Sequence, residues 1–264
     1  MKNTIIDALK SSGQILIENF KKINKISIKQ NQSHIVTKTD LESEKNIVSI
    51  IESKFPNHSI IAEETGFKIK NLEYLWIIDP IDGTSNFASQ IPWFGILIGV
   101  LKNFKPIMAG IYLPYYDELY FAEKGKGSFL NGKRIFVTKE TDLKNVLFSY
   151  SLDFSEDKLK TEFETRIIKE LIDDIRNLRA TNSVVDFCYT ADGRLGGFIN
   201  QTTKIWDVVA ATLIIEEAGG IITDIKGKPL NFKVNQSNYS RNFTIIGSNK
   251  ILYPKVLELI VKAE

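Results

Sequence analysis

The sequence has few of the side chains that bind soft metals or form covalent cross-links. It holds a single cysteine, Cys188, and only two histidines, His34 and His58, among 264 residues. One cysteine excludes a disulfide within the chain. Two histidines exclude a histidine-rich zinc site, so a metal site in this chain would be built from oxygen ligands, which favour Mg2+ or Mn2+.

Long hydrophobic runs and a strong net charge are also absent. No apolar run approaches the ~20 residues that a membrane-spanning helix needs, and the N-terminal MKNTIIDALKSSGQ has polar residues where a signal peptide has its apolar core. We therefore expect a cytoplasmic protein without a membrane partner. A formal net charge of +2 gives no reason to expect binding to nucleic acid. With 43% hydrophobic and 25% charged residues, the chain is expected to be an ordinary soluble globular protein of one large or two small domains.

The most informative stretch is WIIDPIDGTSNF, residues 76–87. Its apolar start predicts a buried strand that stops at Asp79. Asp79 and Asp82 flank a proline that fixes φ and precede a glycine that lets a ligand approach the backbone, which suits a hard cation. The amides of Gly83 and Thr84 would then face an anion held by the cations. A plain turn is the alternative, because Asp-Pro and Asp-Gly are common turn dipeptides.

Two more apolar segments end in carboxylates. Residues 59–66 (SIIAEETG) lead to Glu63 and Glu64, and residues 205–220 (IWDVVAATLIIEEAGG) place Asp207 at the start of a helical pattern. Asp207 alone would be equally explained as a helix N-cap. If these acidic groups converge, they repel one another unless cations or protons balance their charge. We therefore expect a shared divalent cation site.

These segments, in this order, resemble the inositol monophosphatase family of Mg2+-dependent, lithium-sensitive phosphatases, including its bacterial inositol-1-monophosphatase-like members. The resemblance spans nearly the whole chain and rests on five motifs: Glu63-Glu64, residues 79–84 (DPIDGT), Trp206-Asp207 with residues 217–220 (EAGG), residues 35–40 (IVTKTD) and residues 125–132 (GKGSFLNG). It implies a homodimer and inhibition by Li+ or Ca2+.

The alternation of helices with short strands predicts a layered α/β or α+β fold. The resemblance implies an αβαβα sandwich of the inositol monophosphatase and fructose-1,6-bisphosphatase type, with the ligands between its halves. We expect an N-terminal half, residues 1–137, with most metal ligands, and a C-terminal half, residues 138–264, with Asp207 and the substrate-selecting residues.

The spacing of hydrophobic residues predicts the ranges of the individual helices and strands. Helices are expected at residues 5–22, 41–55, 156–176, 184–191, 207–217 and 251–261, and strands at 74–78, 93–101, 105–112, 118–123, 196–200, 221–225 and 242–246. The glycine-rich residues 123–134 lack the ending of a phosphate-binding P-loop, so we expect a hairpin with an Asn131-Gly132 turn.

The expected site has two full cation positions and a weaker third. The ligands that we expect for two or three Mg2+ ions, with Mn2+ as a substitute, are Glu63, Asp79, the Ile81 carbonyl, Asp82 and Asp207, with Glu64 near the third ion. Metals that neutralise charge and a positioned water lower the barrier of phosphate monoester hydrolysis, without a phosphoenzyme.

The remaining catalytic assignments come from the resemblance. It implies that Asp40 and Thr84 orient and deprotonate the attacking water, with Glu64 also in the catalytic group. Thr39 or Asp40 could equally be only a helix N-cap. The resemblance also places Lys29 where a lysine reaches the metal region, although a solvated lysine explains Lys29 as well.

Substrate selection is less constrained. Relatives that act on inositol phosphates carry a glutamate where this chain has Asn200, and small residues where it has Thr181, Asn182 and Ser183. We expect Gly83, Thr84, Asn182, Ser183 and Asn200 to line the substrate site. The expected activity is hydrolysis of small phosphate monoesters such as inositol monophosphate.

Three alternatives remain open. The substrate could be a sugar bisphosphate such as fructose-1,6-bisphosphate or a 3′(2′),5′-bisphosphate nucleotide, with Arg194 or Lys204 meeting the second phosphate. A non-enzymatic alternative is a regulatory or RNA-associated binding protein on the same fold.

Overall fold

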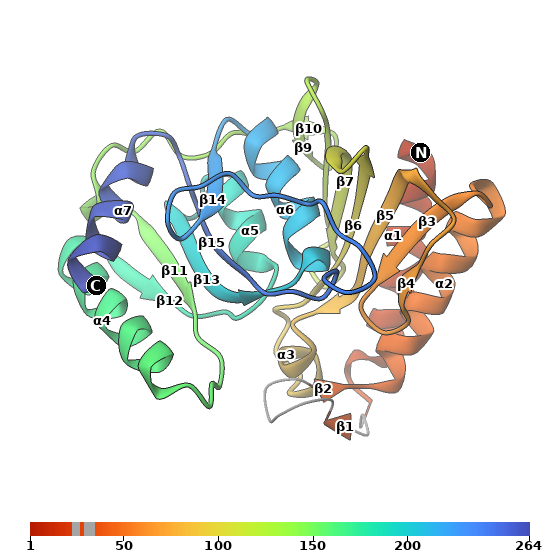
Figure 1. Ribbon diagram of the computed structural model, residues 1–264, viewed down its shortest axis with the longest axis horizontal. Coiled ribbons are helices and arrows are strands. Elements are labelled where there is room, and N and C mark those ends of the chain that lie inside the picture. The colour runs from red at the N-terminus through yellow and green to blue at the C-terminus, as the bar shows by residue number, and fades with distance from the viewer. Residues whose placement is uncertain (23–26, 29–34) are drawn as a thin grey trace.

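The computed structural model describes residues 1–22, 27–28 and 35–264. Over these residues six of the seven α-helices and two large sheets form five layers, in the order helices, sheet, helices, sheet, helices (Figure 1). The mixed α/β sandwich predicted from the sequence is therefore confirmed. Lys29 and His34 lie outside the described residues.

The first layer consists of α1 (Lys2–Phe20) and α2 (Lys38–Lys54), which pack against each other and against the larger sheet. The apolar stripe of α1 is buried as predicted at Ile5, Leu9, Leu16 and Phe20, whereas Ile17 is exposed. In α2 the buried stripe is partly polar. Three of its polar members, Asp40, Ser43 and Glu44, form hydrogen bonds with residues 64–65 and 80–84.

The larger sheet has eight strands in the order β10-β9-β8-β7-β6-β5-β3-β4, and only the β3–β5 pair is parallel. Its strands are β3 (His58–Ala62), β4 (Gly66–Lys68), β5 (Asn71–Asp82), β6 (Gly95–Lys102), β7 (Lys105–Leu113), β8 (Glu118–Glu123), β9 (Gly127–Leu130) and β10 (Lys133–Arg134). The predicted hairpin joins β9 and β10, and its turn residues Asn131 and Gly132 have φ values of 47° and 78°. A short separate pair, β1 (Ser27–Ile28) and β2 (Ile35–Val36), lies near α3 (Thr84–Ala88).

The middle layer is formed by α5 (Val185–Ala191) and α6 (Ile205–Glu217), and α6 contacts both sheets. The second sheet has the order β12-β11-β13-β15-β14, and α4 and α7 cover its outer face. These elements are β11 (Leu147–Ser151), β12 (Asn177–Arg179), β13 (Gly197–Thr203), β14 (Ile221–Asp224), β15 (Phe243–Ser248), the 3-10 turn η1 (Leu143–Asn145), α4 (Lys158–Asp174) and α7 (Leu252–Ala263). The division of the chain near residue 137 stays a prediction.

Several boundaries differ from the sequence predictions. The strand expected to stop at Asp79 continues to Asp82, with a register shift against β6 between these two residues. In α2 the N-cap is Thr37, and in α6 the helix begins at Ile205. Asp40 and Asp207 are therefore third residues of their helices, where an acidic side chain accepts a hydrogen bond from the N-cap backbone.

Two sequence interpretations of individual side chains were also wrong. The apolar spacing in residues 156–176 predicts that Leu159 points inward, but Leu159 lies in the first turn of α4 and is 75% exposed. The turn pattern of residues 56–58 (PNH) predicts that His58 is an exposed loop residue. Instead it stacks between Phe55 and Tyr74, and its Nδ1 accepts a hydrogen bond from Trp76 Nε1 at 3.0 Å.

No helix in the described ranges has the length and apolar character required to span a bilayer.

Candidate metal centre

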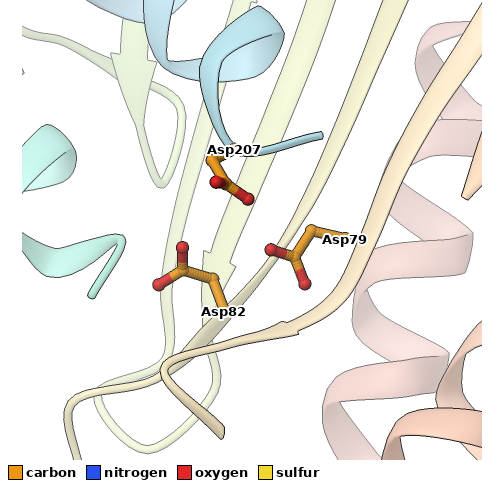
Figure 2. Close-up of side chains that lie close together, drawn as sticks. All are labelled: Asp79, Asp82 and Asp207. Carbon is orange, nitrogen blue, oxygen red and sulfur yellow. The ribbon is translucent and has the colours of Figure 1, made fainter. Parts of the chain in front are cut away.

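Three aspartates from two distant parts of the chain meet at one point. Asp79, Asp82 and Asp207 each offer a carboxylate oxygen, and these oxygens lie within 4.8 Å of one another. Figure 2 shows the three carboxylates turned toward a common space, two from the end of β5 and one from α6. The sequence predicted a convergence of acidic groups from three segments, and these three aspartates come from two of them.

The irregular end of β5 makes this convergence possible. In a regular strand, residues three apart point to opposite faces of the sheet. The register shift between Asp79 and Asp82 redirects one of them, as β-bulges do. Pro80 lies inside the shift, where its missing N–H does not break the ladder. Both carboxylates therefore reach the same side.

A backbone N–H orients each of the three carboxylates. Ile81 N donates to Asp79 Oδ1 at 3.0 Å, and Lys204 N donates to Asp207 Oδ2 at 2.7 Å. Asp82 accepts from the amide of Val184. Each of these bonds uses one oxygen of its carboxylate.

Ionisation of these three carboxylates without a cation is unfavourable. Burial, and then the negative charges of the neighbouring carboxylates, raise the pKa of Asp79 and of Asp82 well above its ordinary value, and the pKa of Asp207 is raised for the same reasons. Asp79 is buried, whereas Asp82 and Asp207 keep part of their surface open to solvent. Among the described residues no lysine or arginine forms an ion pair with these three. An oxygen-only donor set that forms no ion pair with a basic side chain fits a divalent hard cation.

Glu63 and Glu64 lie in the turn between β3 and β4, and both are half-buried. Glu63 is not part of the close trio, but its charge acts on all three aspartates by raising the pKa of each. The structure therefore places Glu63 at the edge of the cluster. Ile81, the other expected ligand in the first half, uses its carbonyl to accept a hydrogen bond from Thr84 Oγ1 at 2.9 Å.

Asp40 and Thr84 are in contact, as the resemblance implied. The Thr84 hydroxyl lies 3.1 Å from Asp40 Oδ1, and Asp40 Oδ2 accepts from Thr37 N at 2.8 Å and from Thr37 Oγ1 at 2.6 Å. Asp40 is fully buried, and burial raises its pKa although the Thr37 hydrogen bonds oppose this. Because Thr84 remains half-buried, any action of Asp40 on water would pass through Thr84.

Gly83 precedes α3 in a left-handed conformation, with φ 83° and ψ 35°. A Cβ at this position would lie 2.5 Å from the Trp93 carbonyl oxygen and 3.1 Å from Ser183 Cβ. Only glycine fits this position. The same contact places Ser183, an expected substrate residue from the second half, beside the end of β5.

The other expected substrate residues are engaged in local hydrogen bonds. Asn182 Nδ2 donates to Leu152 O at 2.8 Å and to Asp153 Oδ1 at 3.1 Å. Asn200 Oδ1 accepts from Thr202 N at 2.8 Å. Both side chains are half-buried: Asn200 lies in β13, paired with the last residue of β11, and Asn182 lies in the loop between β12 and α5, bonded to the residue that follows β11. Ligands commonly bind at the carboxyl ends of strands in α/β sheets.

Two buried carboxylates behind the site were missed from the sequence, Glu44 and Asp186. Glu44 accepts hydrogen bonds from the amides of Glu64 and Thr65, each at 2.8 Å. Its signal in the sequence is its position three residues before Ile47, on the buried face of α2. An acidic residue on a buried face indicates a specific partner.

Comparison with known proteins agrees with this geometry. The model of the inositol monophosphatase family matches residues 1–264. The chain is 34% identical to a fructose-1,6-bisphosphatase/inositol-1-monophosphatase of Aquifex aeolicus over 96% of this chain and 92% of the relative. It is 37% identical to the Nus factor SuhB of Vibrio cholerae over 86% of each chain. The structure of an IMPase from Thermotoga maritima superposes with a TM-score of 0.86 at 30% identity, over 98% of this chain and 95% of that one.

The family and these relatives support a phosphatase-type enzyme that acts on small phosphorylated substrates, and the acidic cluster is consistent with the metal dependence typical of the family. By its sequence over the full length and by its fold, the chain belongs to the inositol monophosphatase family.

Proposed function

We propose that this protein is a Mg2+-dependent phosphatase that hydrolyses small phosphate monoesters such as inositol monophosphate. The observation that carries the proposal is the approach of the Asp79, Asp82 and Asp207 oxygens to within 4.8 Å of one another. Glu63 and the Ile81 carbonyl complete the proposed ligand set for two or three ions, with Mn2+ as a substitute and Li+ or Ca2+ as inhibitors.

Bound Mg2+ would neutralise phosphate charge and activate water. The chain itself supplies the positioning groups. Thr84 Oγ1, in contact with Asp40, is placed to orient the attacking water and pass a proton toward the carboxylate. The amides of Gly83 and Thr84 are proposed to bind the phosphate oxygens. A water-based attack from this pair requires no covalent phosphoenzyme. A role for Glu64 in catalysis belongs to the same proposal.

The surroundings of the site bear on the substrate. Arg194 does not suit a second phosphate, because it stacks 3.5 Å from the Tyr189 ring centre and forms ion pairs with Glu118 and Asp192. Lys204 is half-buried next to the cluster and could meet one. A monophosphate is therefore our first choice, and a sugar bisphosphate, as in the name of the Aquifex relative, is the alternative.

A second candidate is a regulatory or RNA-associated binding role. It is favoured by the relatives named Nus factor SuhB. The oxygen cluster argues for catalysis, because a pure binding surface does not need three aspartates in contact. A homodimer is proposed for either role.

Phosphate release from inositol monophosphate, fructose-1,6-bisphosphate and adenosine 3′,5′-bisphosphate, with and without Mg2+, tests the proposal. We expect Mg2+-dependent release that Asp82→Ala abolishes while thermal unfolding shows an intact fold. Asp173→Ala, an exposed aspartate of α4, is the matched control and should behave like the wild type. No release from any substrate, or an active Asp82→Ala variant, would refute the phosphatase and favour binding.

A further inference from the structure

The buried Glu44 has no part in the proposed chemistry, yet both of its carboxylate oxygens are used. Glu44 lies on α2, one turn after Asp40, and is 1% exposed. Oε2 accepts from Glu64 N and Oε1 accepts from Thr65 N, each at 2.8 Å. A carboxylate is suited to this task because it offers an acceptor to each of two adjacent amides.

Those amides belong to the turn that carries Glu63. At its start, Glu63 N donates to Ile78 O at 3.2 Å, which ties the turn to β5 directly before Asp79. At its end, the next two amides are held by Glu44. The backbone around Glu63 is therefore fixed from two sides, by the strand and by the helix.

The polar face of α2 has a wider pattern. Ser43 Oγ donates to Pro80 O at 3.0 Å, and Asp40 contacts Thr84 Oγ1 at 3.1 Å. Buried polar residues on one face of α2 thus hold both the stretch from Pro80 to Thr84 and the turn at residues 64–65. Among these residues, Glu44 is the one that binds the turn carrying Glu63.

We propose that Glu44 is a positioning residue that sets the affinity of the site for divalent cations by fixing the turn that presents Glu63. The inference rests on the proposed function, in which Glu63 and Asp79 bind the ion. Glu44 touches neither ion nor substrate, because its oxygens are occupied by backbone donors. Outer partners of this kind typically change metal affinity or activity by about 10- to 100-fold when removed.

The charge of Glu44 supports a specific role. Burial raises its pKa, the hydrogen bonds from residues 64 and 65 lower it, and the nearby charge of Glu63 raises it further. Burying an ionised carboxylate costs free energy unless hydrogen bonds compensate it, and here the two backbone amides supply those bonds. In Glu44→Gln one acceptor is replaced by an NH2 group, which would face a backbone N–H.

The test compares Glu44→Gln with Glu42→Gln, which changes an exposed glutamate two residues away on the same helix. Binding of Mn2+ is measured by calorimetry, and the Mg2+ concentration for half-maximal phosphate release is measured with the preferred monophosphate. We expect Glu44→Gln to weaken Mn2+ binding and to raise the Mg2+ requirement about tenfold, with most of kcat recovered at saturating Mg2+. Glu42→Gln should match the wild type.

A merely structural role would lower the melting temperature and kcat but leave the half-saturating Mg2+ concentration unchanged. That result in a folded Glu44→Gln variant overturns the inference and leaves the proposed function standing. A wild-type protein that binds Mn2+ but releases no phosphate refutes the proposed function. Calorimetry of Mn2+ binding to Glu44→Gln then still tests the inference on Glu44. A wild type that neither binds Mn2+ nor releases phosphate refutes both. If Glu44→Gln does not fold, Glu44→Asp keeps the charge, withdraws the carboxylate from the turn, and is expected to weaken binding in the same direction.

Discussion

The pH dependence of the free energy of unfolding tests whether burial raises the pKa of Asp186. This residue lies in the first turn of α5 and is 1% exposed. Its carboxylate accepts hydrogen bonds from Thr181 Oγ1 at 2.8 Å and from Ser151 Oγ at 3.1 Å. Burial raises the pKa of Asp186 from 3.8 to about 6, although the hydroxyl donors act in the opposite direction.

The direction of the pH effect on stability follows from the difference between the pKa of Asp186 in the folded protein and in the unfolded chain. Folding favours the protonated form, so the stabilising contribution is complete below about pH 4 and is lost as the pH rises through about 6. A difference of about 2 pH units corresponds to about 3 kcal/mol in the free energy of unfolding, at about 1.36 kcal/mol per unit. The variant Asp186→Asn keeps the shape of the side chain but cannot titrate.

We expect the free energy of unfolding of Asp186→Asn, relative to the wild type, to rise by about 3 kcal/mol from below pH 4 to above pH 7. Urea unfolding at several pH values, with EDTA present so that metal binding does not contribute, measures this difference. Asp173→Asn, at an exposed position of α4, is the control and should show a flat difference. A flat difference for Asp186→Asn as well would refute the reasoning.

Three further predictions concern single side chains. Thr84→Ala removes the hydroxyl that contacts the Asp40 carboxylate and the Ile81 carbonyl, so kcat should fall about 100-fold. Thr84→Ser keeps a hydroxyl and should keep most of the activity. A wild-type kcat in the alanine variant would contradict the assignment. Gly83→Ala forces a Cβ to within 2.5 Å of the Trp93 carbonyl at φ 83°, and should lower the free energy of unfolding in urea by more than about 1 kcal/mol; an unchanged midpoint would argue against it. His58→Phe leaves Trp76 Nε1 without its acceptor and should cost about 1–3 kcal/mol at pH 7. Because burial lowers the pKa of His58, the wild type should lose stability relative to His58→Phe as the pH falls from 7 to 5, and a difference in urea unfolding that does not change with pH would count against this.

Much of the fold was accessible from local patterns. The apolar stripe of α1, the strand β8 and the turn at Asn131 and Gly132 each depend on the residues of one short segment. For such elements, side-chain periodicity and allowed backbone angles carry enough information. Element boundaries were less accurate, as the continuation of β5 to Asp82 shows.

The three aspartates of the cluster were named from the sequence, but their arrangement was not. The three aspartates were identified because each follows or begins an apolar segment. Glu44 and Asp186 were missed, since partners of each, the amides of Glu64 and Thr65 and the hydroxyl of Ser151, belong to segments distant in the sequence. A charged residue whose partner lies far along the chain has the same local pattern as a solvated one.

By itself, the sequence determined which acidic groups this protein can bring to a cation, and in which order along the chain they occur. Only the tertiary structure decided how they meet. The register shift in β5 turns Asp79 and Asp82 to one side, and the packing of α6 against both sheets brings Asp207 to them. These relations depend on pairing and burial between distant segments, and neither residue spacing nor periodicity encodes them.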